Sequence, residues 1–163
     1  MTSLSDRRSD WASFEQAAPG VVAALGMLGK AIDDSGLEKQ LTELLKLRAS
    51  QLNGCAFCLQ FHLNLARKIG LEQAKIDLGA TWRDAGVFSA RERAALAWTE
   101  ALTFMAQQQV TEAQFAELQA AFTESEIAFL TSAVAAINAW NRIAGALQFS
   151  PPIPKKQVTD NTK

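Results

Sequence analysis

Four helix-start signals limit what this chain of 163 residues can fold into. In each, a serine or threonine is followed three residues later by glutamate or glutamine, and the signals begin at Ser35, Ser89, Thr111 and Thr123. In such a capping box the Ser or Thr hydroxyl accepts a hydrogen bond from the backbone amide of the third helical residue. The Glu or Gln side chain of that residue accepts one from the backbone amide of the Ser or Thr. No stretch of the sequence shows the sustained alternation that strands require. The sequence therefore predicts an all-α fold.

Apolar residues at three- and four-residue steps, with Gly and Pro as stop signals, set the expected helices. We expect seven or eight of them in one domain over residues 11–149. The predicted segments are 11–17, 19–34, 35–53, 55–69, 71–84, 89–107, and two that open at Thr111 and Thr123, the last reaching about Phe149. Residues 1–10 are expected to be a flexible leader, and the polar residues 150–163 a disordered tail.

The charge and hydropathy of the sequence argue against a nucleic-acid-binding, membrane-associated or secreted protein. The formal net charge is −1, so the chain lacks the basic excess of a nucleic-acid-binding protein or a polybasic membrane-surface segment. The N-terminus has no apolar core of a secretory signal, and the apolar runs are too short to span a bilayer. We therefore expect a cytoplasmic protein. In a reducing cytosol, a close pair of cysteines is more often catalytic, redox-active or metal-binding than structural.

The chain's two cysteines and its only histidine lie within eight residues, at Cys55, Cys58 and His62. If Gly54 ends one helix, Cys55 lies in the first turn of the next, where unpaired amides and the helix dipole lower a thiol pKa. Cys58 is then on the same face and within disulfide reach. His62 is one turn beyond Cys58 and can serve it as a base.

This group of side chains suits peroxide reduction. A thiolate attacks the O–O bond, the leaving alkoxide takes a proton, and the sulfenate condenses with the second thiol. Two other interpretations stay open from the residues alone. Buried cysteines can simply pack, and a structural zinc site is a further possibility. Zinc, however, would need a carboxylate or water as its fourth ligand.

Three separated motifs resemble the alkylhydroperoxidase AhpD-like branch of the carboxymuconolactone decarboxylase family. The first is LRASQLNGCAFC over residues 47–58, preceded by Glu43 and followed by His62. The others are RERAALAWTEA over residues 91–101 and AINAWNR over residues 136–142. The resemblance extends over roughly residues 14–149.

The resemblance implies an all-helical protein that assembles as trimers or hexamers and reduces hydroperoxides with a dithiol. It assigns the attack to Cys58, resolution to Cys55, and a proton relay to His62 and Glu43. It implies no metal or other cofactor, and electrons from a lipoylated or thioredoxin-like dithiol protein. The helix-dipole argument alone would instead select Cys55 as the more acidic thiol.

Periodicity does not favour Glu43, which lies off the apolar stripe of its helix and by default would be exposed. However, if the chain reverses at Asn53-Gly54, Glu43 lies about 15 Å back along one helix and His62 about 12 Å along the next. An antiparallel pair of helices would then place the two side chains at similar depth.

Phe57 departs from the family pattern, since the best-studied type has a second histidine between its cysteines. A relay here must run through Glu43, His62 and water. The departure keeps open a non-peroxidatic thiol–disulfide carrier or sensor. A third alternative is a lactone decarboxylase, whose chemistry does not require a dithiol.

Other polar residues on apolar stripes are expected to be structural. Arg48 needs an acidic partner, for which we suggest Glu100. Aromatic residues on the apolar stripes are expected in the core or at subunit contacts; they are Trp98, Phe129 and Trp140. The polar residues of the last helix are expected to hydrogen-bond locally or to line an interface; they are Asn138, Asn141 and Arg142.

Overall fold

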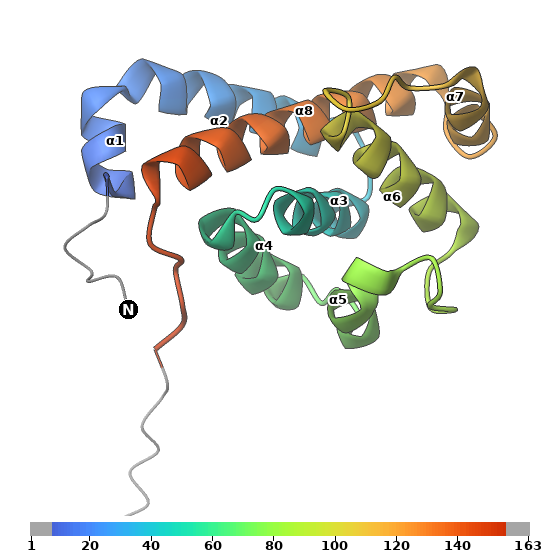
Figure 1. The fold of residues 1–163 in the computed structure, drawn as a ribbon, viewed down its shortest axis with the longest axis horizontal. Coiled ribbons are helices and arrows are strands. Elements are labelled where there is room, and N and C mark those ends of the chain that lie inside the picture. The colour runs from blue at the N-terminus through green and yellow to red at the C-terminus, as the bar shows by residue number, and fades with distance from the viewer. Residues whose placement is uncertain (1–7, 156–163) are drawn as a thin grey trace, which may run out of the picture.

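The computed structural model describes residues 8–155, and in that range the chain is all α-helical and forms no strand. The all-α prediction is confirmed, with eight α-helices (Figure 1). They are α1 (Trp11–Ala17), α2 (Pro19–Asp33), α3 (Lys39–Leu52), α4 (Ala56–Lys68), α5 (Gln73–Leu78), α6 (Ala90–Thr103), α7 (Glu112–Gln119) and α8 (Glu124–Leu147).

Three of the four capping boxes form, and they cap α6, α7 and α8. The fourth prediction, at Ser35, is wrong. The Ser35 hydroxyl donates to the Ile32 carbonyl at the end of α2, at 2.7 Å, and α3 begins only at Lys39. The reason is that Glu38 is drawn away from the turn, because its carboxylate binds the guanidinium of Arg91.

The single helix predicted over residues 71–84 is also wrong. Only α5 is α-helical there, followed by one 3-10 turn over Gly79–Thr81. Arg93 explains the break, since its guanidinium binds the carbonyls of Trp82, Arg83 and Ala85 and fixes this segment in an irregular turn. The next helix, α6, stops at Thr103, four residues before its predicted end.

Helix α3 lies in the middle of the fold, packed against α4, α6 and α8 (Figure 1). The long helix α8 runs across the molecule and also contacts α2 and α7. Because neighbours cover α3 on several sides, its polar residues Thr42, Glu43 and Ser50 are as buried as its leucines.

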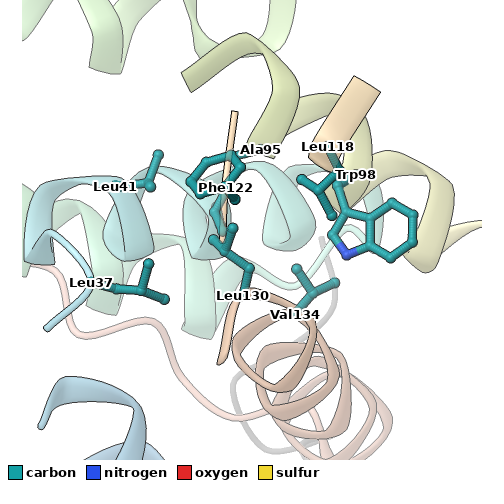
Figure 2. Packing of buried hydrophobic residues seen from close by; sticks show 9 residues of the cluster. Leu37, Leu41, Ala95, Trp98, Leu118, Phe122, Leu130 and Val134 are labelled. Atoms are coloured by element: carbon teal, nitrogen blue, oxygen red, sulfur yellow. The ribbon is translucent and has the colours of Figure 1, made fainter. Parts of the chain in front are cut away.

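The largest apolar cluster joins α3, α6, α7 and α8 (Figure 2). Its members are Leu37, Leu41, Leu45, Ala95, Trp98, Leu118, Phe122, Leu130 and Val134. Burying a large apolar side chain stabilises a fold by about 1.5–3 kcal/mol. Trp98 lies in this core and its indole donates to the Thr131 hydroxyl at 3.0 Å, while Phe129 packs at the edge of the cluster. For both residues the expectation of a core position is confirmed.

Arg48 has the acidic partner that we expect, since its Nε donates to Oε1 of Glu100 at 2.8 Å. The Trp82 indole also donates to this carboxylate at 2.8 Å, and Arg83 binds its other oxygen. Burial raises the pKa of Glu100, but these hydrogen bonds outweigh burial and hold the pKa below its usual value. This cluster connects α3 to α6 and to the irregular turn before α6.

Both ends of the described chain lie near α4 and the end of α8. Ser9 and Arg8 donate to the carbonyls of Leu147 and Ala146, and Asn64 on α4 donates to the Pro152 carbonyl. Most of the predicted leader (1–10) and tail (150–163) lies outside the described residues. Within residues 8–155, no helix combines the length and hydrophobicity needed to cross a bilayer.

Candidate active site

A tight corner between α3 and α4 places the two cysteines. Gly54 has a φ of +64°, in the left-handed region that glycine adopts without strain. The next residue, Cys55, is held by its own amide, which donates to the Ser50 carbonyl at 3.1 Å. Gly54 thus turns the chain so that α4 starts beside the buried end of α3.

Cys55 is the N-cap of α4, one position before the first turn that the sequence predicts for it. Its sulfur accepts a hydrogen bond from the Cys58 amide, at 3.4 Å. Both cysteines are free thiols, and they are 2% and 3% exposed. The pair therefore lies at the positive end of α4 and almost completely out of contact with solvent.

The two sulfurs share their protons unequally. The hydrogen bond from the Cys58 thiol, together with backbone amides of α4, lowers the pKa of Cys55 to about 6 even though burial opposes the shift. The same contact, together with burial, raises the pKa of Cys58 above its usual range. The helix-dipole expectation that Cys55 is the more acidic thiol agrees with this arrangement.

Glu43 and His62 meet between α3 and α4. The Oε2 atom of Glu43 lies 2.6 Å from Nδ1 of His62, and its Oε1 atom accepts from Lys46 at 2.8 Å. The Glu43 side chain is completely buried, so the exposed position that periodicity suggested is wrong. The expectation that Glu43 and His62 lie at similar depth is confirmed by their contact.

The charge on Glu43 is stabilised by its neighbours. Burial raises the pKa of the carboxyl, but the hydrogen bond and electrostatic attraction of His62, with those of Lys46, outweigh burial and hold the pKa at about 2. Lys39 adds a second cation, 3.3 Å from the same carboxylate. Glu43 is therefore ionised at neutral pH.

Aromatic side chains cover the cysteines on the side of α1 and the C-terminal segment. Phe57 contacts Phe149 edge-on at 5.4 Å and stacks with Trp11 at 6.1 Å, and Trp11 contacts Trp140 at 5.6 Å. Phe14 and Phe149 pack in the same cluster as the two cysteines. The position where the family pattern has a second histidine thus belongs to an aromatic cover.

Asn141 is a further residue of the site, and the sequence alone does not mark it as one. It is 3% exposed and its amide donates to the Ser50 hydroxyl at 3.1 Å. Its side chain also helps to lower the pKa of Cys55. Its signal in the sequence was an asparagine on a nearly apolar helix, which we had assigned to local bonding or an interface.

The donor set for a metal ion is limited. Cys55, Cys58 and His62 are the residues that the zinc interpretation requires, but residues 8–155 contain no group of three His, Cys, Asp or Glu side chains placed to hold a metal ion. Glu43, which could have supplied a fourth ligand, is instead engaged with His62 and Lys46.

The sequence and the fold are similar to those of known proteins. The model of the carboxymuconolactone decarboxylase family matches residues 19–101. The uncharacterized protein YdfG of Bacillus subtilis (strain 168) is 30% identical over 135 residues, which cover 83% of this chain and 92% of YdfG.

Two solved structures have the same fold. One is an Agrobacterium tumefaciens protein of unknown function, described as a candidate antioxidant defence protein AhpD. It is 37% identical, with a TM-score of 0.86, and the match covers 91% of this chain and all of the other. The second is the AhpD core of an uncharacterized peroxidase-related protein from Ralstonia eutropha JMP134, with a TM-score of 0.75. At 22% identity over 88% of this chain and 80% of the other, the second likeness concerns the fold alone.

Proposed function

The chain belongs to the carboxymuconolactone decarboxylase family and has an AhpD-like fold, and from this premise we propose that it is a thiol-dependent peroxidase. It reduces hydroperoxides through a dithiol–disulfide cycle of Cys55 and Cys58. The observation that carries the proposal is the 2.6 Å contact between the buried Glu43 carboxylate and His62, one helical turn from Cys58. This contact fixes a proton donor and acceptor on α4, four residues after Cys58 and so on the same face of the helix.

The first half of the cycle is attack by Cys58, as the family resemblance assigns it. In this cycle the charge of the reduced pair is assigned to Cys55, whose pKa is lowered while that of Cys58 is raised. As Cys58 attacks, its proton passes to Cys55, a new S–O bond forms, and the O–O bond breaks. The products are a sulfenic acid on Cys58 and an alkoxide, which takes a proton from protonated His62 and leaves as an alcohol.

The second half forms the disulfide. Cys55 gives its proton to His62 and attacks the sulfenic sulfur, and the departing hydroxide takes that proton and leaves as water. In sum, two thiols and one hydroperoxide give one disulfide, one alcohol and one water. Glu43, with a pKa of about 2, stays ionised throughout, so it orients His62 and balances its charge rather than carrying the proton.

Burial of the sulfurs favours a small oxidant over a protein partner as the substrate. A disulfide carrier must present a sulfur to the thiolate of another protein, whereas these two are 2% and 3% exposed. Reduction of the disulfide is assigned to a dithiol protein, lipoylated or thioredoxin-like, because the cycle contains no other electron source, and this exchange requires the aromatic cover over the sulfurs to open locally. The cycle uses no metal or other cofactor.

Assembly into a homo-oligomer, as a trimer or hexamer, is part of the same proposal. Helix α2 is strongly apolar, yet among its described residues only Ile32 is buried within one chain. Val21, Met27 and Leu28 are exposed large apolar side chains on it. A second copy of the chain could cover this surface.

The test is peroxide consumption by the purified protein with a dithiol reductant, using cumene hydroperoxide and hydrogen peroxide. We expect turnover in the native protein, none in Cys58→Ser, and a disulfide in mass spectra of the oxidised protein. Ala56→Ser is the matched control, since it adds a hydroxyl to the same turn of α4 and leaves both thiols. Absence of consumption, or consumption that survives Cys58→Ser, would contradict the proposal.

A further inference from the structure

We propose that Asn141 is a further hydrogen-bond donor that stabilises the anionic sulfur of Cys55, beside the Cys58 amide, and that Asn53, Asn138 and Arg142 fix its amide in the donating orientation. This inference rests on the proposed dithiol chemistry and adds a residue to it. It concerns how the thiolate is stabilised, which can be measured without any peroxide.

The position of Asn141 on α8 supports a direct role. Ile137 and Ala144, four residues before and three residues after it, pack in one cluster with Cys55 and Cys58. Residues at these spacings share one face of a helix. Asn141 therefore lies on the α8 face that covers the sulfurs, and it is a buried polar side chain on that face.

The orientation of the amide follows from a chain of hydrogen bonds that begins at Arg142. A guanidinium can only donate, and Nη1 of Arg142 donates to Oδ1 of Asn138 at 2.9 Å. The group of Asn53 that faces this oxygen must then be its NH₂, and the distance between them is 3.0 Å.

The same NH₂ group of Asn53 faces Asn141. It donates to Oδ1 of Asn141 at 2.9 Å, so the oxygen of Asn141 is turned toward Asn53. Its NH₂ group is consequently turned toward the Ser50 hydroxyl, at 3.1 Å, and it lies on the α8 face that packs against the cysteines. An amide nitrogen has two N–H donors, so one serves Ser50 and the other is left for a sulfur.

Such an arrangement favours the charged form of the thiol. A hydrogen bond to an ionised group is stronger than one between neutral groups, especially out of contact with water. The NH₂ group of Asn138 also donates to the Val134 carbonyl, at 2.9 Å. Arg142 and this carbonyl thus act through Asn138 and Asn53 to present an N–H group of Asn141, and not its carbonyl oxygen, to the buried thiolate.

The experiment is a pH titration of the thiolate in the reduced protein, followed by its ultraviolet absorbance and by the rate of alkylation. We expect the apparent pKa to rise by about one unit in Asn141→Leu, since a hydrogen bond to an anion of this kind is lost. It should rise by less in Asn53→Ala, because the amide of Asn141 is retained but free to turn. The double variant should match Asn141→Leu, because Asn53 acts only through Asn141.

Asn64→Leu is the matched control. Asn64 is a partly buried amide on α4 that binds the Pro152 carbonyl and Gln60, so its loss should lower the melting temperature without moving the titration. The proposal would be overturned if Asn141→Leu had the same apparent thiolate pKa as the native protein. It would also be overturned if the pKa shift of the double variant were the sum of the shifts of Asn141→Leu and Asn53→Ala. If Asn141→Leu does not fold, Asn141→Ser and Asn53→Ala supply the same comparison.

The outcome is separable from that of the proposed function. A protein that consumes no peroxide but shows these shifts would contradict the peroxidase assignment and support the role of Asn141. A protein that consumes peroxide and titrates identically in all variants would do the reverse.

Discussion

The rings of Trp11 and Phe57 are stacked, with 6.1 Å between their centroids and 11° between their planes. Trp11 is the first residue of α1, and Phe57 stands between Cys55 and Cys58 in the sequence. Phe149, near the other end of the described chain, contacts both rings, at 6.2 Å from Trp11 and 5.4 Å from Phe57. Trp11 and Phe149, which lie far apart in the sequence, thus both pack against Phe57 and cover the thiols with it.

Loosening this contact should expose the thiols. In Trp11→Ala we expect the reduced pair to be alkylated about five- to tenfold faster, because an aromatic contact contributes about 0.5–1.5 kcal/mol beyond the burial of its area and its loss favours local opening. The measurement is the rate of reaction with a maleimide. Phe115→Ala removes a ring that contacts Trp98 at 5.9 Å, away from the thiols, and should leave this rate unchanged. Equal rates in all three proteins would show that this contact does not control access.

Replacing Glu43 should impair chemistry more than binding. In Glu43→Gln the carboxylate that fixes His62 is lost, and we expect peroxide consumption to fall by about ten- to a hundredfold, within the range associated with general acid–base groups. Glu117→Gln, an exposed glutamate of α7, is the control. The comparison to make is kcat at saturating peroxide, and an unchanged kcat in Glu43→Gln would exclude a role for the carboxylate in proton transfer.

The same carboxylate should make stability depend on acidity. Its pKa is about 2 in the folded protein, below its value of about 4.3 in an unfolded chain. A carboxyl group whose pKa is lower in the folded protein than in the unfolded chain stabilises the fold at pH values above its unfolded pKa. This contribution is lost as the pH falls toward the pKa of the folded protein. From pH 5 to pH 2 we therefore expect the native protein to lose up to about 3 kcal/mol that Glu43→Gln does not lose. Urea unfolding of both proteins across this range measures the difference, and parallel curves would contradict it.

Removing the charge of Glu100 should be costly. Its carboxylate binds Arg48, Arg83 and the Trp82 indole, so Glu100→Gln leaves a partly buried guanidinium without its counter-ion. We expect the free energy of unfolding to fall by about 3 kcal/mol. Glu38→Gln removes the more exposed carboxylate that pairs with Arg91 and should cost less than about 1 kcal/mol. Equal losses would mean that burial of the pair does not matter.

Oligomer assembly should depend on the exposed face of α2. Met27 is 73% exposed in the single chain, and a lysine there would be costly to bury against a second copy. We expect the native protein to sediment as a trimer or hexamer at micromolar concentration, and Met27→Lys to sediment as a smaller species. Lys30→Met, which removes an exposed charge from the same helix, should not dissociate the assembly. A monomeric native protein would contradict the proposed assembly.

Local signals in the sequence predict most of the helices, and they fail where tertiary contacts compete with them. Ser89, Thr111 and Thr123 cap helices as expected because their partners lie three residues away. Ser35 has the same local pattern, but Glu38 finds Arg91 across the fold. Nothing within the four residues of the pattern could have indicated that contact.

The site was predictable in its composition and only partly in its geometry. The scarcity of Cys and His identified the segment, and the reversal at Gly54 correctly predicted that Glu43 and His62 lie at similar depth. Burial of Glu43 could not be read from periodicity, because periodicity assumes one buried face and α3 is enclosed by α4, α6 and α8. Asn141 was missed for a related reason, since its partners Ser50 and Asn53 are about 90 residues away in the sequence.

The sulfur of Cys55 also caps the N-terminus of α4, because it accepts a hydrogen bond from the backbone amide of Cys58. Structural and redox contributions of this one atom can be separated by the choice of replacement. Serine is among the residues that cap helices best and alanine among the poorest. Cys55→Ser would keep the helix start without the redox function, whereas Cys55→Ala would remove both. A comparison of reactive-cysteine variants in this protein is therefore also a comparison of helix caps, and serine is the replacement that isolates the chemistry.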